Sequence, residues 1–195
     1  MISALLIVFG VLAGLSRSPA QDPPRPVRVV IETEAGEIEA EIDTARAPIT
    51  AANFLRYVDA GLLDGGTFFR TVRPDNQVDK PVKIAVIQAS GNRDRRSEFF
   101  PAIPLERTSV TGLSHRDGTL SMARATPDTA RDSFSICVGD QPSLDFGGAR
   151  QPDGQGFAAF GQVVRGMEVV RKIQASPATG ETLTPAIRII RVRRR

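Results

Sequence analysis

Few side chains in this chain could carry out covalent or metal-assisted chemistry. Its 195 residues include one histidine, His115, and one cysteine, Cys137, without a spaced Cys/His cluster or a Gly-x-Ser-x-Gly motif. Hydrolytic triads and zinc sites therefore lack their usual residues. His115 precedes a glycine turn, which favours a loop residue over a general base, and a strand position favours a small core residue for Cys137. The chemistry that remains is donation by arginines such as Arg70, whose guanidinium donates hydrogen bonds without exchanging protons.

The elements expected around these residues are mostly strands. Residues 119–123 are short and apolar after a glycine, and residues 133–138 alternate apolar with small side chains, which is the period of a strand. Residues 125–132 are longer than a tight hairpin needs, so we expect a surface loop that carries function. Arg70 falls on a strand expected over residues 67–72. Judged by position alone, a surface ion pair explains this arginine as well as a catalytic role does.

The rest of the chain predicts a mainly β fold. A hairpin is expected from Val27 to Ile42, and we interpret its alternating carboxylates as a solvated face. Arg193 to Arg195 are interpreted as a solvated strand end, with binding to an acidic surface as the alternative. Short helices against many strands favour a closed antiparallel barrel with two short helices capping its ends. Helices are expected over residues 48–59 and 166–174, and further strands over 84–87 and 186–192. Residues 73–83 are interpreted as an insertion, and residues 91–100 and 146–156 as loops.

Four segments resemble, in order, motifs of the cyclophilin-type peptidyl-prolyl cis-trans isomerases. The stretch from Gly118 to Asp145 is similar to the family's run of small, Met, Ala and polar residues that leads into a strand ending in Phe-Ile. The others are Gly-Thr-Phe-Phe-Arg at 66–70, Ile-Gln at 87–88 and Phe-Ala-Ala-Phe-Gly-Gln-Val at 157–163. The resemblance covers residues 27–192. It implies the cyclophilin barrel, rotation about Xaa-Pro bonds in proline-containing polypeptides, and no cofactor or metal.

The resemblance also implies which residues act. The barrier to prolyl rotation, about 18–20 kcal/mol, comes from amide resonance, which a donor to the imide nitrogen weakens. Arg70 matches the family's catalytic arginine, and Gln88 matches its substrate-aligning glutamine. Ala123 and Arg124 lie where backbone groups would hold an extended peptide. The substrate-binding residues implied in this way are Phe68, Ala85, Val86, Gln88, Ala123, Arg124, Ser133, Ser135, Leu144 and Phe157.

The expected proline pocket is less aromatic than is usual in this family. Ser135 stands where a Phe is usual, Ser133 where a Gln is usual, and Ser143 where many members have Trp; Ala85 and Val86 replace Phe and Met. Such exchanges lose about 1–3 kcal/mol of contact with a prolyl ring, which weakens binding tenfold or more. Phe99 and Phe100 are candidates to fill the gap. The alternatives are therefore a catalytically weak peptide-binding module or chaperone, and a purely structural barrel that binds no peptide.

The N-terminal residues favour export. Residues 2–15 are apolar and uncharged, and small residues precede Ala20, so we expect a signal peptide at 1–20, a Pro-rich tether at 21–26 and the isomerase domain at 27–195. The mature protein would then be periplasmic or secreted, with an N-terminal membrane anchor as the alternative. Without Arg17 the charge is 24 basic against 22 acidic residues, or +2, which indicates neither a nucleic-acid nor a membrane partner. We expect a monomer.

Overall fold

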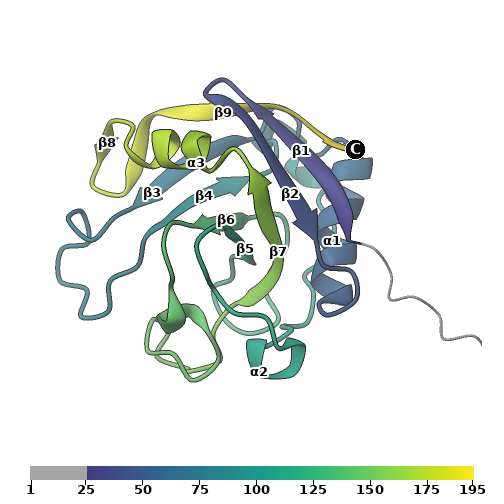
Figure 1. Ribbon diagram of the computed structural model, residues 1–195. Coiled ribbons are helices and arrows are strands. Elements are labelled where there is room, and N and C mark those ends of the chain that lie inside the picture. Colours follow the sequence, from purple (N-terminus) through teal and green to yellow (C-terminus); the bar gives the residue numbers. More distant parts are fainter. Residues whose placement is uncertain (1–25) are drawn as a thin grey trace, which may run out of the picture.

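The predicted closed antiparallel barrel is confirmed by the computed structural model, which describes residues 26–195. Within this range the strands form one antiparallel sheet in the order β1-β2-β7-β5-β6-β4-β3-β9-β8, and pairing of β1 with β9 closes it (Figure 1). The expected signal peptide and nearly all of the tether lie outside the described residues. The strands are β1 (Val27–Thr33), β2 (Gly36–Ile42), β3 (Thr67–Val72), β4 (Val86–Ser90), β5 (Thr119–Met122), β6 (Phe134–Cys137), β7 (Ala158–Arg165), β8 (Ala178–Thr179) and β9 (Thr182–Arg194).

Two helices cover the barrel, as the sequence predicted. Helix α1 (Pro48–Asp59) begins at a proline, whose missing N–H costs nothing in the first turn, and contacts β7 and β9. Helix α3 (Met167–Gln174) contacts β2, β3 and β4, on a different side of the barrel (Figure 1). It begins one residue later than expected because Gly166 has a φ of 90°. No helix within residues 26–195 is long and apolar enough to cross a bilayer.

Three further helical turns occupy segments without a predicted helix. They are α2 (Thr108–Thr111) and the 3-10 helices η1 (Arg93–Glu98) and η2 (Pro142–Leu144). The expected loop at 91–100 is therefore partly helical. Its helix is capped by the side chain of Asn92, which accepts from the N–H of Asp94 at 3.1 Å. Such short turns bury little apolar surface, so they leave no hydrophobic period in the sequence.

An aromatic core fills the barrel. Phe54 from α1 packs 5.3 Å from Phe134 and 5.2 Å from Phe160, measured between ring centroids, and Phe68 lies 6.1 Å from Phe134. The Phe54–Phe134 and Phe68–Phe134 pairs meet edge to face, the geometry that ring quadrupoles favour. These four side chains are at most 1% exposed. The barrel is therefore held by residues from α1 and three strands that are distant in sequence.

A smaller apolar cluster lies on the opposite face of the sheet. It consists of Val72, Ile84, Val86, Cys137 and Leu144, with Phe157 packed against it. Cys137 is fully buried, as expected of a small core residue, and burial raises the pKa of its thiol, so the thiol stays protonated. The cluster is separate from the main core because strand side chains alternate between two faces. This second face carries the groove described below.

Strands β5 and β6 are one or two residues shorter than expected, and β4 and β9 differ from the expected bounds by more. Strand β4 begins at Val86 because the N–H of Ile84 is donated to the side chain of Gln77, and that of Ala85 to the side chain of Gln141. At Ile84 and Ala85, side-chain oxygens thus accept the backbone N–H groups that a neighbouring strand would otherwise accept. Strand β9 is longer than expected, because its ends pair with β1 and β8.

Candidate functional site

A groove of about 150 Å³ runs across the outer face of β3, β4, β5 and β6. A larger depression of about 550 Å³, lined by Glu41, Leu113 and Gln162 among others, holds none of the predicted site residues, so volume alone does not identify the site. The groove brings together Arg70, Val86, Gln88, Ala123, Arg124, Ser135, Leu144 and Phe157 from the sequence expectation, and adds Ile84, Ser121, Met122, Arg150 and Gln151.

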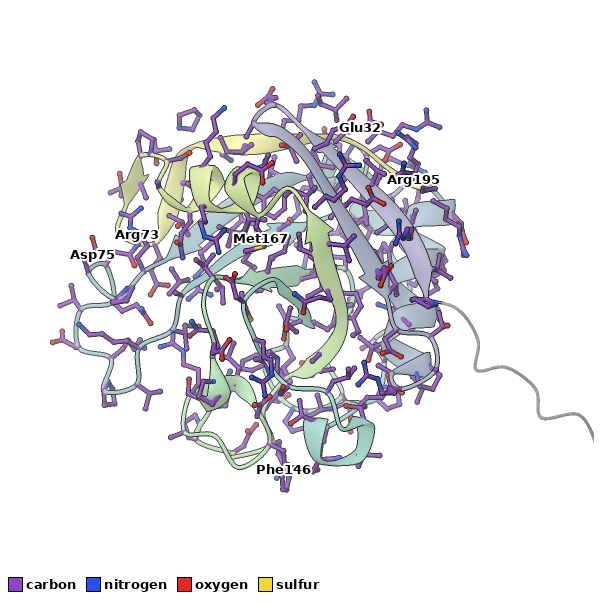
Figure 2. The ribbon with its side chains drawn as sticks, viewed as in Figure 1. Glu32, Arg73, Asp75, Phe146, Met167 and Arg195 are labelled. Carbon is purple, nitrogen blue, oxygen red and sulfur yellow. The ribbon has the colours of Figure 1, made fainter. Side chains whose placement is uncertain are left out.

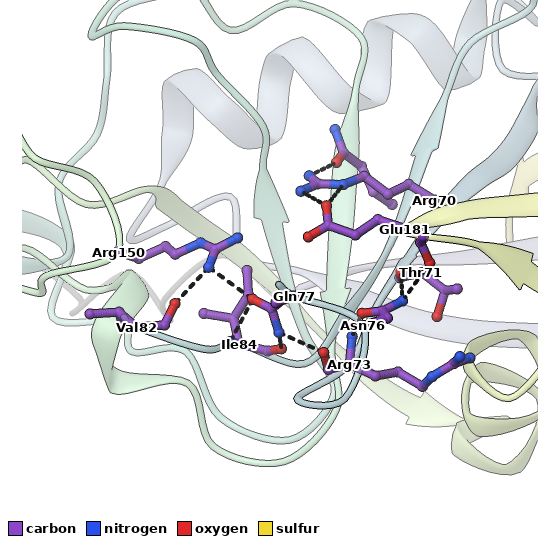
Figure 3. A network of polar contacts seen from close by, with 11 residues as sticks. Arg70, Thr71, Arg73, Asn76, Gln77, Val82, Ile84, Arg150 and Glu181 are labelled. Atoms are coloured by element: carbon purple, nitrogen blue, oxygen red, sulfur yellow. Dashed lines mark hydrogen bonds and ion pairs between the residues drawn. The ribbon is translucent and has the colours of Figure 1, made fainter. Parts of the chain in front are cut away.

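Arg70 is held by two partners (Figure 3). Its Nε donates to Glu181 Oε2 at 2.8 Å, Nη2 contacts the same oxygen, and Nη1 donates to Gln88 Oε1 at 2.8 Å. Arg70 pairs with Gln88 in the β3–β4 register and with Thr182 in the β3–β9 register, so the turn before β9, which carries Glu181, lies next to it. A guanidinium has five N–H groups, and these contacts use three. One N–H on Nη1 and one on Nη2 remain for a ligand. Arg70 is thus ion-paired with Glu181 and also lines the groove.

Gln88 is oriented by a short chain of hydrogen bonds. Its Nε2 donates to Ser133 Oγ at 3.0 Å, and that hydroxyl donates to the carbonyl of Ala89 at 2.7 Å. This fixes which end of the amide points to Arg70, since the oxygen must accept from the guanidinium. Ser133 therefore supports Gln88 from behind rather than lining the groove.

The apolar wall of the groove is formed by the second cluster. Val86, Leu144 and Phe157 line it, and the guanidinium of Arg124 lies 5.1 Å from the Phe157 ring centroid. Arg124 has a fully buried side chain that donates to Gly156 O at 2.8 Å and pairs with Asp153 through two bonds of 2.8 and 2.9 Å. This arginine thus ties the loop that follows η2 to the end of β5. Its pairing lowers the pKa of the Asp153 carboxyl.

Besides Ser133, two more of the expected groove residues, Phe68 and Ala85, lie elsewhere. Phe68 is fully buried inside the barrel against Phe134. Regular alternation would place Phe68 and Arg70 on the same face of β3, but the register shift between them puts their side chains on different faces. Ala85 is absent from the groove, and its neighbour Ile84 lines it instead. In an extended chain residues 84, 86 and 88 share a face, so the alternation itself would have selected Ile84.

Phe99 and Phe100 do not fill the gap in the pocket. Both pack on Tyr57 of α1, with ring centroids 5.6 and 5.0 Å away, and Phe100 also lies under the guanidinium of Arg56 at 4.4 Å. They are therefore part of the packing around α1. The groove stays thinly aromatic, with Phe157 as the one aromatic side chain among its lining residues in the described chain.

The insertion at 73–83 forms part of the site. Asn76 donates to the carbonyls of Thr71 at 3.0 Å and Gly180 at 2.9 Å, and so holds the turn that carries Glu181 (Figure 3). Asp75 of the same segment projects away from the barrel (Figure 2). Through Asn76 the insertion thus supports Arg70, a role that no sequence motif signals.

His115 has partners that the sequence did not suggest. It lies in a loop, as expected, but is only 2% exposed, with Nδ1 2.6 Å from Asp145 Oδ1 and Nε2 2.8 Å from Ser121 Oγ. This is the order of groups in a hydrolytic triad, which the single histidine had argued against. Ser121 is itself 3% exposed. The two hydrogen bonds of His115 therefore link the floor of the groove, at Ser121, to the loop after η2, at Asp145. Burial lowers the pKa of His115, and the bond to Asp145 opposes this.

No group of three or more His, Cys, Asp or Glu side chains within residues 26–195 could hold a metal ion.

Comparison with known proteins agrees with this geometry. Residues 28–194 match the family described as cyclophilin type peptidyl-prolyl cis-trans isomerase/CLD. Peptidyl-prolyl cis-trans isomerase A of Dickeya dadantii is 35% identical over 170 residues, which cover 87% of this chain and 82% of the relative. A peptidyl-prolyl cis-trans isomerase of Acinetobacter baylyi is 36% identical over 152 residues, covering 77% and 73%.

Solved structures share the fold. A cyclophilin-type isomerase of Cryptosporidium parvum superposes with a TM-score of 0.66 at 19% identity and covers 87% of this chain and 98% of its own. The same protein determined in the presence of the dipeptide Ala-Pro gives a TM-score of 0.65 at 20% identity, with coverage of 86% and 98%. At this identity the likeness concerns the barrel. With the family match over nearly all described residues, it follows that this chain belongs to the cyclophilin-type peptidyl-prolyl cis-trans isomerases, and that its enzyme class is theirs.

Proposed function

We propose that this protein rotates Xaa-Pro bonds in the groove over β3 to β6, with Arg70 as the electrostatic catalyst. The observation that carries this role is the geometry of its guanidinium, whose plane is held by Glu181 and Gln88 while two N–H groups stay available. A donor to the imide nitrogen localises its lone pair and weakens the resonance that resists rotation. The uncatalysed step takes about 10–100 s, slow enough to limit folding.

The remaining groove residues are assigned to binding. Val86, Leu144 and Phe157 offer the apolar surface on which a prolyl ring can pack. The N–H of Ala123 is donated to the carbonyl of Ser133 at 2.9 Å, so a peptide contact at Ala123 would use its carbonyl. Main-chain contacts of this kind tolerate many peptide sequences. Ser135 replaces aromatic surface with a hydroxyl, which favours weak binding of the ring.

Exchange spectroscopy by NMR tests the catalytic role. A short Ala-Pro peptide is mixed with the purified protein, with its Arg70→Ala variant, or with Arg96→Ala as a control for removal of an exposed arginine outside the groove. We expect faster cis-trans exchange with the protein and the control, and a loss of about a hundredfold in Arg70→Ala, which is typical when one transition-state donor is removed.

The same spectra separate the alternative of a catalytically weak peptide-binding module. If the peptide signals shift on addition of protein while cis-trans exchange stays at the uncatalysed rate, the isomerase proposal fails and the protein is a peptide-binding module. The observation that favours this alternative is Ser135 in the groove wall. Catalysed exchange that persists in Arg70→Ala would contradict the catalytic role of Arg70, without bearing on the fold.

We further propose that the chain is exported and assists folding of exported proteins in the periplasm or outside the cell. The apolar run at 2–15 and the small residues before Ala20 support cleavage there. Intact-mass analysis of protein purified from cell fractions tests this, and a mass that begins at Gln21 is expected. A full-length mass in the membrane fraction would instead support the N-terminal anchor.

A further inference from the structure

Three arginines line the groove, and their charges are compensated differently. Arg70 is paired with Glu181, and Arg124 is paired with Asp153. Arg150 makes no ion pair with any residue in the described range 26–195. The groove therefore carries one positive charge in excess, and that charge is on Arg150. A neutral proline peptide would leave it uncompensated.

Arg150 is anchored so that one edge of its guanidinium stays available. Its backbone N–H is donated to Ser143 O at 3.1 Å, and its Nη1 donates to Gln77 Oε1 at 2.8 Å and to Val82 O at 2.6 Å (Figure 3). Gln77 is 3% exposed and its Nε2 donates to the carbonyls of Arg73 and Ile84, both at 2.7 Å. The side chain that holds Nη1 is thus itself fixed.

The available edge has the shape that a carboxylate requires. With both Nη1 hydrogens committed, Nε and Nη2 remain, and their parallel N–H groups match the two oxygens of a carboxylate. Partial burial lowers the pKa of Arg150. The negative charge of Glu181 opposes this shift, and the positive charge of Arg70 adds to it. A cation in such surroundings is stabilised by a new anionic neighbour, since water solvates it incompletely.

We propose that Arg150 makes the groove select peptides that carry an aspartate or glutamate next to the proline. The inference rests on the proposed function of the groove. Arg150 and Arg70 line one groove of about 150 Å³, and residues of an extended peptide are about 3.5 Å apart, so the acidic residue directly adjoins the proline. Gln77 and Val82 belong to the insertion at 73–83, which therefore has a role in choosing substrate.

Four capped peptides test this selection: Ala-Glu-Pro-Ala, Ala-Gln-Pro-Ala, Ala-Ala-Pro-Glu and Ala-Ala-Pro-Gln. Capping removes terminal charges, and each Glu peptide has a Gln peptide of the same shape. Affinity is read from protein chemical shifts and turnover from exchange spectroscopy. In at least one position we expect Glu to bind about fivefold tighter than Gln, in line with a charge-assisted bond at a partly exposed site. The preference should weaken as salt rises.

Variants assign the preference to Arg150. Arg150→Gln should bring the ratio of Glu-peptide to Gln-peptide affinity to about one, Arg150→Lys should restore part of the ratio, and Arg96→Gln should keep it in full. Equal affinity for Glu and Gln at both positions in the unaltered protein would overturn the proposal, as would a preference that persists in Arg150→Gln. Loss of binding to all four peptides in that variant would also overturn it, because Arg150 would then be structural. If no peptide is turned over faster, the isomerase proposal fails, while the shifts still measure the Glu–Gln difference.

Discussion

Arginines at the C-terminal end of β9 and arginines in the groove show two uses of the same side chain. At the barrel edge Arg193 pairs with Glu32, Arg194 with Asp59 and Arg195 with Glu39, at 2.9, 2.6 and 2.6 Å, and Figure 2 shows Glu32 and Arg195 at this edge. These arginines are between 42% and 52% exposed, so water screens each pair. In the groove the side chain of Arg124 is fully buried and that of Arg70 is 34% exposed.

The comparison shows that the contribution of an arginine–carboxylate pair depends on how far the pair is buried and on which guanidinium N–H groups it uses. Two of the edge pairs cover Glu32 and Glu39 of the first hairpin. Glu39 is only 7% exposed, so the predicted solvated face is in part covered by arginines. Hydrogen bonding to Arg195 lowers the pKa of Glu39 against the effect of desolvation. In the groove the pairs instead set the direction of donors toward a ligand. The following predictions separate the two settings.

Arg124→Met should give the largest loss of stability. The carbonyl of Gly156 is buried and would lose its donor, which costs about 2 kcal/mol in the free energy of unfolding. Urea denaturation followed by circular dichroism measures this. The matched control is Arg150→Met, whose guanidinium is half-buried and which should cost less. Equal losses in the two variants would show that the burial of Arg124 has no special consequence.

Glu181→Gln should slow catalysed exchange about tenfold, because misorientation of a catalytic group costs rate steeply. The substitution replaces the charged acceptor of Arg70 Nε and Nη2 by a neutral amide oxygen, which holds the guanidinium less firmly. Peptide affinity, measured by chemical shifts, should stay the same, since Glu181 acts through Arg70. A rate that rises would mean that the carboxylate restrains Arg70 by neutralising it.

His115 should make stability depend on pH. Burial lowers its pKa, so below the unfolded value of about 6.5 the unfolded chain takes up a proton that the folded chain does not. The free energy of unfolding should therefore fall as pH falls below about 6.5, by at most about 1.4 kcal/mol per pH unit for one proton. Urea titrations between pH 7.5 and about 5 should give a smaller slope in His115→Gln. An unchanged slope would contradict the assignment to His115.

Asp59→Asn should have the smallest effect, below about 0.5 kcal/mol in the free energy of unfolding. Its pair with Arg194 lies at the surface, where the hydrogen bond to Arg194 lowers the pKa of Asp59 but solvent screens the attraction. Thermal and urea unfolding at low and high salt provide the measurement. A loss as large as that of Arg124→Met would remove the distinction between edge and groove.

Much of the architecture could be predicted from local pattern. Helix α1 and strand β3 have the predicted bounds, because a proline at the first turn and period-two alternation depend on neighbouring residues alone. The resemblance led to Arg70 and Gln88, and the sheet register brings both to one groove. Phe68 and Ala85 were misplaced because a motif does not state which face of a strand each residue occupies.

The amino-acid sequence by itself determined the family, the barrel and the identity of the groove's central arginine, since these depend on ordered motifs and strand periodicity. Only the tertiary structure decided which charges meet. Glu181 is 111 residues from Arg70, Gln77 is 73 from Arg150, and Asp145 is 30 from His115. Such contacts depend on barrel closure and on the path of two loops, and neither has a local signature. The physical reason is that hydrogen bonds and charges act over a few ångströms in space, whatever the distance along the chain.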